Sequence, residues 1–264
     1  ADFELAGFVT ELGGPTSHTA ILARSLGLPA IVGADGARDM IAEDEVVVID
    51  ADADLIVISP SEDELHELRR RSRAEAEHRS QLRKLKGKLA RTRDGIAIDL
   101  LANIELPEDV AQARDNAAAG IGLFRSEFLF LSRPELPGED EQFEAYRRVA
   151  VEMDGLPVTV RTLDLGADKH PNGVQRFSPN PALGLRAIRL CLAEPQMFHR
   201  QLRAILRASH YGKIKILVPM LSTIHELNQT LHLIDEAKRS LDQEGIPYNG
   251  EIPVGGMIEV PAAA

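Results

Sequence analysis

After Thr92 the chain alternates between short apolar segments and longer helical ones, and this alternation restricts its possible folds more than any other feature. The short segments are rich in β-branched residues and predict strands at 96–103, 120–124, 157–160, 213–220 and 252–258. The segments between them predict helices at 107–119, 139–153, 183–192 and 223–244. Such an alternation is typical of a parallel sheet, open or closed into a barrel, so we predict an α/β fold.

Two further segments precede the alternating one. Residues 1–60 predict a smaller α/β unit with strands at 3–9, 45–50 and 55–58, and with a short apolar segment at 30–32. The first of these strands has no partner ahead of it, so we interpret the unit as the second half of a domain. Residues 61–92 begin with Ser61 and a run of acids, end with basic residues, and carry only a thin stripe of leucines. We interpret 61–92 as a solvated linker helix.

The sequence ELGGPTSHTAILARSLGLPAIVG at residues 11–33 is the motif with the clearest chemical meaning. Thr16 and Ser17 are good N-cap residues after a Gly-Gly-Pro turn, and Gly27 is placed to end the helix. His18 therefore lies in a first turn, where free N–H groups and the helix dipole favour an anion. A neutral imidazole there can accept a phosphoryl group and pass it on. The alternative is a histidine that only faces solvent.

Charged residues follow the predicted strands at their carboxyl ends, where the working residues of βα barrels lie. Arg125 ends the second strand of residues 93–264 and Arg161 ends the third, while Lys169 and Arg186 follow in a loop and at a helix start. Guanidinium groups bind carboxylate and phosphate in bidentate fashion, so these cations predict a pocket for a phosphorylated carboxylic acid. Glu259, after the fifth strand, offers an oxygen ligand for Mg²⁺.

A second interpretation of the arginines stays open. An arginine directly after a buried strand is costly unless it meets an anion or a carboxylate. Internal ion pairs with Glu127, Asp164 or Asp168 would meet this requirement without any ligand.

Composition argues against several other functions. A net charge of −11 and an aromatic content of 4% argue against a nucleic-acid surface. No run is long enough to cross a membrane, and no signal peptide is visible. The single cysteine, Cys191, cannot form an internal disulfide, and we expect it in ordinary core packing. We therefore expect a cytoplasmic protein without membrane insertion and without a nucleic-acid partner.

These motifs resemble those of the phosphoenolpyruvate-utilising enzymes. GGPTSHTAILARSLGLPAIVG is similar to the phosphohistidine signature of that superfamily. Similarity to one member, enzyme I of the sugar phosphotransferase system, extends in order through GIGLFRSEFLF, EDEQFEAYRRVA, VRTLDLGADK, NPALGLRAIR, QLRAILRAS and GMIEVPAAA. The segments VRTLDLGADK and RSEFLF are much closer to enzyme I than to the dikinases and synthases. The resemblance covers nearly the whole chain.

The resemblance implies a reaction and a set of partners. Phosphoenolpyruvate is expected to phosphorylate His18, which then donates to a histidine of an HPr-like phosphocarrier protein, the first step of sugar uptake by this system. The residues that match the family's phosphoenolpyruvate ligands are Arg125 and Arg161, with Arg186 and Lys169 nearby. Glu259 matches a ligand of Mg²⁺. Family members dimerise through the barrel, so a homodimer is expected for the full-length protein.

The resemblance also implies an architecture. Residues 1–60 match part of a swivelling phosphohistidine domain, 61–92 a helical linker, and 93–264 the first five βα units of a TIM-type (β/α)₈ barrel. Three family features have no match here: the HPr-binding helical domain, the Asn-Asp pair and further arginine of the metal and phosphate site, and the cysteine that protonates the enolate carbon. We therefore expect the sequence to be a piece of a longer protein.

Overall fold

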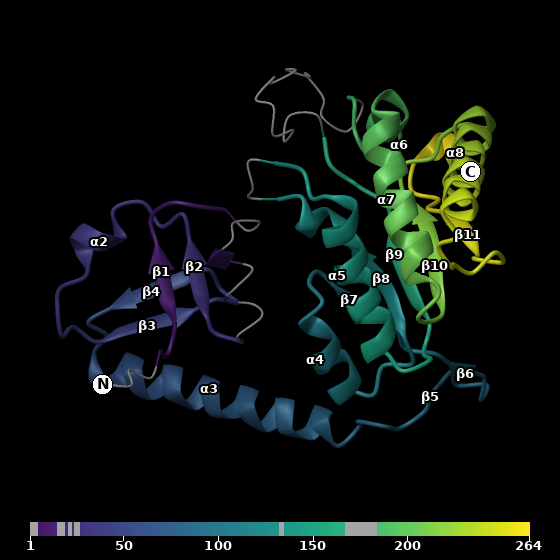
Figure 1. Ribbon diagram of the computed structural model, residues 1–264. Coiled ribbons are helices and arrows are strands. Elements are labelled where there is room, and N and C mark those ends of the chain that lie inside the picture. The colour runs from purple at the N-terminus through teal and green to yellow at the C-terminus, as the bar shows by residue number, and fades with distance from the viewer. Residues whose placement is uncertain (1–4, 15–18, 21–22, 24–26, 132–134, 167–183) are drawn as a thin grey trace. The chain divides into compact units, whose positions relative to one another are not determined.

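The computed structural model describes residues 5–14, 19, 20, 23, 27–131, 135–166 and 184–264 (Figure 1). The chain divides into two compact units, Ala1–Lys86 (unit 1) and Gly87–Ala264 (unit 2). None of the helices within the described ranges combines the length and the apolar character that crossing a membrane requires.

Unit 2 is built on a five-stranded sheet in which all neighbouring strands are parallel. The order across the sheet is β11-β10-β9-β8-β7, so each strand lies beside its predecessor in the sheet. The strands are β7 (Ala102–Ile104), β8 (Ile121–Arg125), β9 (Val158–Arg161), β10 (Ile214–Val218) and β11 (Val254–Gly256). The predicted α/β fold with a parallel sheet is confirmed.

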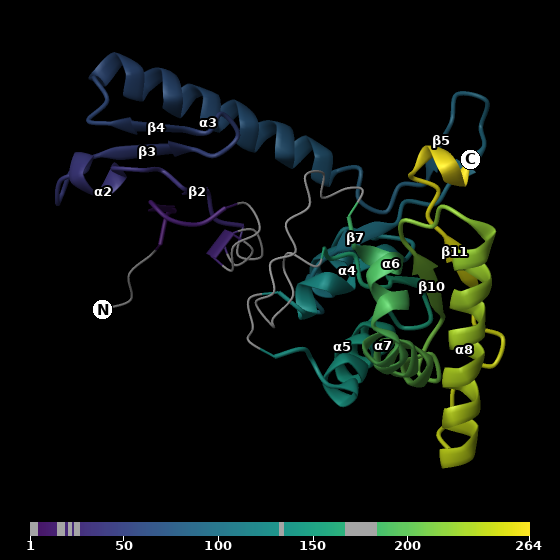
Figure 2. The same ribbon diagram turned by 90° about the horizontal axis from the view of Figure 1, so that it is seen from above.

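The helices of unit 2 are α4 (Asp109–Asp115), α5 (Glu139–Glu152), α6 (Ala187–Ala193), α7 (Pro195–Ala208) and α8 (Ile224–Glu244), with short 3₁₀ helices η1 (Ser126–Leu129) and η4 (Pro261–Ala263). In the view from above, α4, α5, α7 and α8 lie on one face of the sheet (Figure 2). Alternate strand residues such as Val158, Val160, Ile214 and Ile216 are fully buried in the core. This alternation is the pattern expected of a sheet packed against one layer of helices.

The predicted strand at 96–103 is wrong in its extent, because a hairpin occupies its first half. Gly95 has a φ of 88° and lies in a turn where Thr92 N–H donates to Ile96 O at 2.9 Å. The turn joins β5 (Ala90–Arg91) to β6 (Ala97–Ile98) in an antiparallel pair. Only residues from Ala102 onward enter the parallel sheet.

Helix α7 does not appear among the predicted elements. The helix predicted at 183–192 begins at Ala187, and residue 183 lies outside the described residues. A second helix, α7, follows after Glu194 alone, with Pro195 in its first turn. Proline is favoured at that position because its missing N–H would have no helical partner there. The boundary between the two helices therefore depends on one proline, and α7 supplies eight buried residues to the core.

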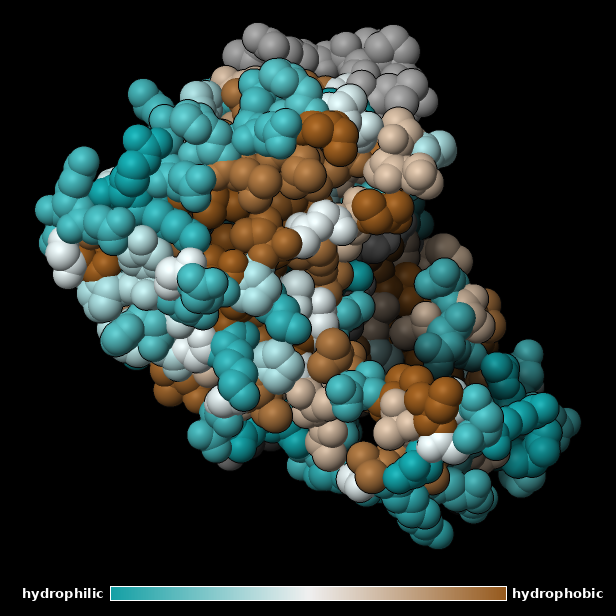
Figure 3. Space-filling model, turned by 90° about the vertical axis from the view of Figure 1, so that its right-hand side faces the viewer, coloured by the Kyte–Doolittle hydropathy of each residue, from teal (hydrophilic) through white to brown (hydrophobic). Residues whose placement is uncertain are grey.

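The surface of unit 2 is not uniformly polar. The face that carries α8 and β11, on the right-hand side of Figure 1, exposes a broad apolar area (Figure 3). The large apolar side chains that unit 2 exposes include Leu89, Ile96, Leu100 and Ile258. Exposed apolar area of this kind is typical of surfaces that contact other protein segments.

The described residues of unit 1 include two small strand pairs, a short helix and a long helix. Strand β1 (Phe8–Thr10) runs parallel to β2 (Ala30–Val32), and β3 (Val47–Asp50) runs antiparallel to β4 (Leu55–Ile58). Helix α2 (Ala37–Met40) is a single turn, whereas α3 (Glu62–Arg83) is long and has no buried residue. Ser61 and Glu64 form the capping box that starts α3. The exposure of α3 agrees with the solvated helix predicted from the sequence.

Candidate anion-binding site

The carboxyl ends of β8 and β9 bring two predicted site residues together. Arg125 and Arg161 are the last residues of adjacent strands and are register partners in the sheet. Arg186 precedes α6 and forms an isolated antiparallel bridge with Gly166, five residues beyond the end of β9. The sequence placed these arginines after separate strands, and the parallel register makes two of them neighbours.

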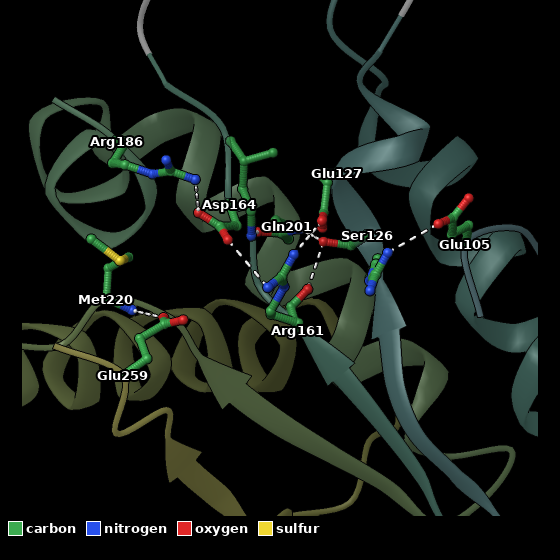
Figure 4. Close-up of polar contacts among 11 residues, drawn as sticks. Glu105, Ser126, Glu127, Arg161, Asp164, Arg186, Gln201, Met220 and Glu259 are labelled. Atoms are coloured by element: carbon green, nitrogen blue, oxygen red, sulfur yellow. Dashed lines mark hydrogen bonds and ion pairs between the residues drawn. The ribbon is translucent and has the colours of Figure 1, made fainter. Parts of the chain in front are cut away.

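Arg161 is at the centre of a chain of ion pairs (Figure 4). Its Nη2 donates to Glu127 Oε1, and its Nη1 lies 3.1 Å from Asp164 Oδ2. The other oxygen of Asp164, Oδ1, accepts from Arg186 Nη2 at 2.9 Å. The side chains of Glu127, Arg161 and Asp164 are each about nine-tenths buried, at 10–12% exposure. Two cations and two carboxylates therefore alternate in a nearly dry environment.

Arg125 forms a separate and more accessible pair. Its Nη1 donates to Glu105 Oε1 at 3.0 Å, and 39% of its side chain is exposed. Glu105 follows directly after β7, the neighbour of β8 in the sheet. Three arginines and three carboxylates thus meet along the carboxyl edges of β7, β8 and β9, so the cluster has no net charge.

Several polar atoms of this cluster are buried without a hydrogen-bond partner. Across the part of the chain that the structure describes, the buried side-chain atoms without a partner are Glu127 Oε2, Arg161 Nε, Thr162 Oγ1 and Arg186 Nε. All four belong to the ion-pair chain or to the residue that follows Arg161. Buried polar groups are normally satisfied, and a concentration of exceptions calls for an explanation. The two free guanidinium N–H groups are donors suited to a further anion.

Burial also affects the protonation of Glu127. Loss of solvent raises the pKa of its carboxyl above the ordinary value, and the ion pair with Arg161 opposes this effect without cancelling it. A proton on this carboxyl would remove its negative charge and so weaken its attraction for the guanidinium of Arg161.

The internal ion pairs considered as an alternative are thus present. Glu127 and Asp164 pair with Arg161, and Asp164 also pairs with Arg186. Asp168 lies outside the described residues. These pairs leave the guanidinium Nε donors of Arg161 and Arg186 unused, so they do not account for the whole arrangement.

Glu259 lies on the same edge of the sheet, after β11. Its Oε1 accepts a hydrogen bond from Met220 N at 2.8 Å, which orients the carboxylate (Figure 4). Met220 follows β10 and has a φ of 58°, a strained conformation for a residue other than glycine. Within the described residues no three His, Cys, Asp or Glu side chains gather as a metal site. One exposed carboxylate suits Mg²⁺, which often binds one or two protein carboxylates plus substrate oxygens.

His18 and Lys169 both lie outside the described residues. The described parts of the motif around His18 agree with a helix that ends at Gly27: Thr19, Ala20 and Ala23 are helical. Gly27 has a φ of 66°, and Leu28 N donates to Ala23 O at 2.9 Å, the bond that closes a helix in a Schellman motif. The local signals for the helix end are therefore confirmed, while the role of His18 stays a prediction.

The sequence analysis predicted no role at the site for residues of the helix layer. Gln201 of α7 is fully buried, and it bonds to the backbone or side chains of residues after β8 and β9. A glutamine within an apolar helix stretch is the signal that could have found it, because a buried amide needs specific partners.

Two family descriptions match the chain. Residues 79–264 match "PEP-utilising enzyme, PEP-binding domain", where PEP is phosphoenolpyruvate, and residues 2–54 match "PEP-utilising enzyme, mobile domain". The three arginines and Glu259 all fall within the first of these matches.

Curated relatives carry the name phosphoenolpyruvate-protein phosphotransferase. The protein of Cupriavidus necator is 53% identical over 261 residues, which cover 97% of this chain and 44% of the relative. The protein of Geobacillus stearothermophilus is 46% identical over 260 residues, covering 98% and 45%. That of Staphylococcus epidermidis is 44% identical over 259 residues, again covering 98% and 45%. The chain thus spans less than half the length of these relatives.

Proposed function

This chain belongs to the PEP-utilising enzymes, and from that premise we propose that it is part of a phosphoenolpyruvate-protein phosphotransferase. The observation that carries the proposal is the arginine cluster at the carboxyl ends of β8 and β9, with buried guanidinium donors that lack partners. The cluster falls within the match to the PEP-binding domain. Phosphoenolpyruvate, with a phosphate and a carboxylate on a three-carbon frame, has the charge and size that such a cluster recognises.

Substrate binding is proposed to occur by exchange of partners. Arg161 and Arg186 exchange the carboxylates of Glu127 and Asp164 for oxygens of the substrate, or add substrate oxygens at their free Nε donors. Arg125, whose guanidinium is the most exposed of the three, binds the outer part of the same anion. Lys169 adds a further positive charge. Because the cations are already fixed by ion pairs, little side-chain entropy is lost when the substrate replaces the internal partners.

The proposed reaction is an in-line phosphoryl transfer. A ring nitrogen of neutral His18 forms a bond to phosphorus while the bond between phosphorus and the enol oxygen breaks, and the enolate of pyruvate leaves. A proton taken up at the enolate carbon completes pyruvate. The arginines stabilise charge on the transferring group and hold it in line, which is most of what catalysis of phosphoryl transfer requires. Phosphorylated His18 then donates to a histidine of an HPr-like carrier protein.

Glu259 is the proposed protein ligand for Mg²⁺. A bound Mg²⁺ supplies charge neutralisation between the phosphate and the carboxylate of the substrate. The hydrogen bond from Met220 N fixes one oxygen of Glu259 and leaves the second for coordination.

The proposed organisation follows the family. Residues 1–60 form part of a swivelling phosphohistidine domain, 61–92 a helical linker, and 93–264 the first five βα units of a TIM-type barrel. A swivelling domain is required because one histidine must reach both phosphoenolpyruvate and the carrier. We further propose a cytoplasmic location and, in the full-length protein, a homodimer formed through the barrel.

The test is a labelling experiment with the full-length protein that carries this chain. The protein is incubated with Mg²⁺ and either ³²P-labelled phosphoenolpyruvate or γ- or β-labelled ATP, beside a His18→Ala variant. We expect acid-labile label from phosphoenolpyruvate alone, and none in the variant. Label from ATP would assign the protein to the dikinase group instead. A folded protein that takes label from neither would contradict an enzymatic role.

A further inference from the structure

The segment QLRAILRAS, residues 201–209, forms the second half of helix α7 and its C-cap, and its polar residues have no role in the function proposed above. Gln201, its first residue, is fully buried on the helix layer behind the sheet. A buried amide is unfavourable unless its donors and acceptor are satisfied. The partners of Gln201 therefore indicate why a glutamine stands at this position rather than a leucine.

The oxygen of the Gln201 amide binds the backbone beyond β9. Thr162 N still donates to Leu217 O of β10 at 2.9 Å, as a continuation of the sheet ladder. Leu163 N is the next amide, and it donates instead to Gln201 Oε1 at 2.9 Å. Leu163 is buried, so without Gln201 its N–H would lose its partner away from water. Gln201 thus fixes the chain two residues after Arg161.

The nitrogen of the same amide binds the chain beyond β8. Gln201 Nε2 donates to Ser126 Oγ at 3.0 Å and to Tyr146 OH at 3.2 Å. Ser126 Oγ in turn donates to Arg161 O at 2.6 Å (Figure 4). Ser126 lies between Arg125 and Glu127, two members of the ion-pair cluster. One side chain therefore connects the ends of both strands that present the arginines.

We propose that Gln201 is a positioning residue for the anion site, because through Leu163 and Ser126 its amide holds the strand ends that present Arg125 and Arg161. The proposal rests on the proposed function insofar as it expects phosphoenolpyruvate to bind these arginines. Bidentate recognition by a guanidinium depends on its orientation, so a small rotation of the strand end weakens binding without unfolding the sheet. Gln201 itself does not touch the substrate.

Two hydroxyl deletions separate positioning from a merely structural role. Ser126→Ala and Tyr146→Phe each remove one hydroxyl that accepts from Gln201 Nε2. Ser126 Oγ donates to the backbone oxygen of Arg161, whereas the hydroxyl of Tyr146 donates to Gln142 Oε1 and makes no bond to the backbone of Arg161. In the full-length protein we expect Ser126→Ala to weaken phosphoenolpyruvate binding about tenfold by calorimetry, the equivalent of ~1.4 kcal/mol. We expect Tyr146→Phe to leave the Kd within about twofold, although both lower the Tm.

Gln201→Met tests the role of the amide directly, because methionine keeps the side-chain volume and removes all three hydrogen bonds of the amide. We expect Gln201→Met to raise the Kd for phosphoenolpyruvate at least as much as Ser126→Ala does. The double variant Gln201→Met, Ser126→Ala should have nearly the same Kd as Gln201→Met alone. KM for phosphoenolpyruvate should rise more than kcat falls, since ground-state contacts are affected. Equal effects of Ser126→Ala and Tyr146→Phe on the Kd, or additive effects of Gln201→Met and Ser126→Ala, would overturn the proposal.

A readout independent of activity distinguishes failure of the inference from failure of the function. Hydrogen–deuterium exchange is followed in peptides that contain Leu163. We expect Gln201→Met to accelerate exchange there at least about tenfold, and Tyr146→Phe to leave it unchanged. If the wild type does not bind phosphoenolpyruvate but the exchange difference is found, the function is wrong and the link from Gln201 to the strand end stands. Unchanged exchange in Gln201→Met removes that link.

Discussion

Two clusters of nearly buried arginines in unit 2 differ in how completely their donors are used. Arg203 of α7 donates through Nε to Glu139 and through both terminal nitrogens to Glu244, with distances of 2.7–2.9 Å, and also to Ser240. The hydrogen bonds that Arg203 donates to the carboxylates of Glu244 and Glu139 raise its pKa above its already high ordinary value. Arg161 has two carboxylate partners as well, yet its Nε has none.

The difference suggests a way to separate a structural ion pair from the proposed anion site. The Arg203 cluster links α5, α7 and α8 and is complete within the protein. The Arg161 cluster is equally rich in partners but contains buried atoms that the protein does not satisfy, and one of its acids has a raised pKa. Completeness of hydrogen bonding, more than the presence of a partner, therefore distinguishes the two roles.

The largest expected effect comes from Arg161→Lys. A lysine keeps the charge but loses the planar fork that recognises an anion in bidentate fashion. We expect phosphoenolpyruvate-dependent labelling of the full-length protein, measured well below the Tm of the variant, to slow at least about a hundredfold. A labelling rate within a fewfold of the wild type would place Arg161 with the structural ion pairs.

Arg203→Lys is the matched change in the structural cluster. One ammonium cannot replace three guanidinium nitrogens that bind Glu139, Glu244 and Ser240, so we expect a loss of about 2 kcal/mol in the free energy of unfolding. For a domain of this size the Tm should fall by roughly 4–8 °C in calorimetry. Labelling at a temperature well below the transition should stay within about twofold. Slower labelling in the folded variant would show that the two clusters are coupled.

The pH dependence of the Tm, compared between the wild type and Glu127→Gln, tests whether the Arg161 cluster contains an acid with a raised pKa. The folded-state pKa of Glu127 is raised above its ordinary value of 4.5, so the folded protein binds a proton more tightly than the unfolded chain. This group therefore contributes stability below pH about 4.5 that is lost as pH rises through the folded-state pKa. We expect the Tm of the wild type, relative to Glu127→Gln, to decline across that window. A difference that is constant with pH would show that Glu127 has an ordinary pKa.

The smallest effect is expected from Asp140→Asn. Asp140 lies 2.8 Å from Arg207 Nη1, but 88% of its side chain is exposed and Arg207 also binds Glu139. Solvent screens such a pair, so we expect no measurable change in Tm or in labelling. A clear drop in Tm would mean that the structural cluster depends on its exposed partner as well.

The sequence predicts those parts of the structure that local signals determine. The strand predicted at 55–58 matches β4, and the helix predicted at 223–244 matches α8. These features depend on residues a few positions apart. The arginines at the strand ends follow from the same reasoning, because a parallel register aligns the carboxyl ends.

The hydrogen-bond and ion-pair partners of the site residues could not be predicted from local sequence signals. The bond between Gln201 and Ser126 joins residues 75 positions apart, and that between Arg161 and Glu127 joins residues 34 apart. No periodicity carries such information, since it depends on how strands and helices pack. The hairpin ahead of β7 and the separation of α6 from α7 were missed for a simpler reason. In each case the feature depends on one residue, because Gly95 lies in the hairpin turn and Pro195 begins α7.

The charge balance of the arginine cluster has a consequence for how fast a substrate arrives. Three guanidinium groups face three carboxylates, and the whole chain carries a net charge of −11. The described members of the cluster therefore add no net charge that would attract an anion over a distance, and we expect little electrostatic steering from them. Added salt screens the remaining repulsion and should raise the association rate slightly rather than lower it. Under the proposed function, recognition would begin at contact, when substrate oxygens reach donors that the protein's own carboxylates do not occupy.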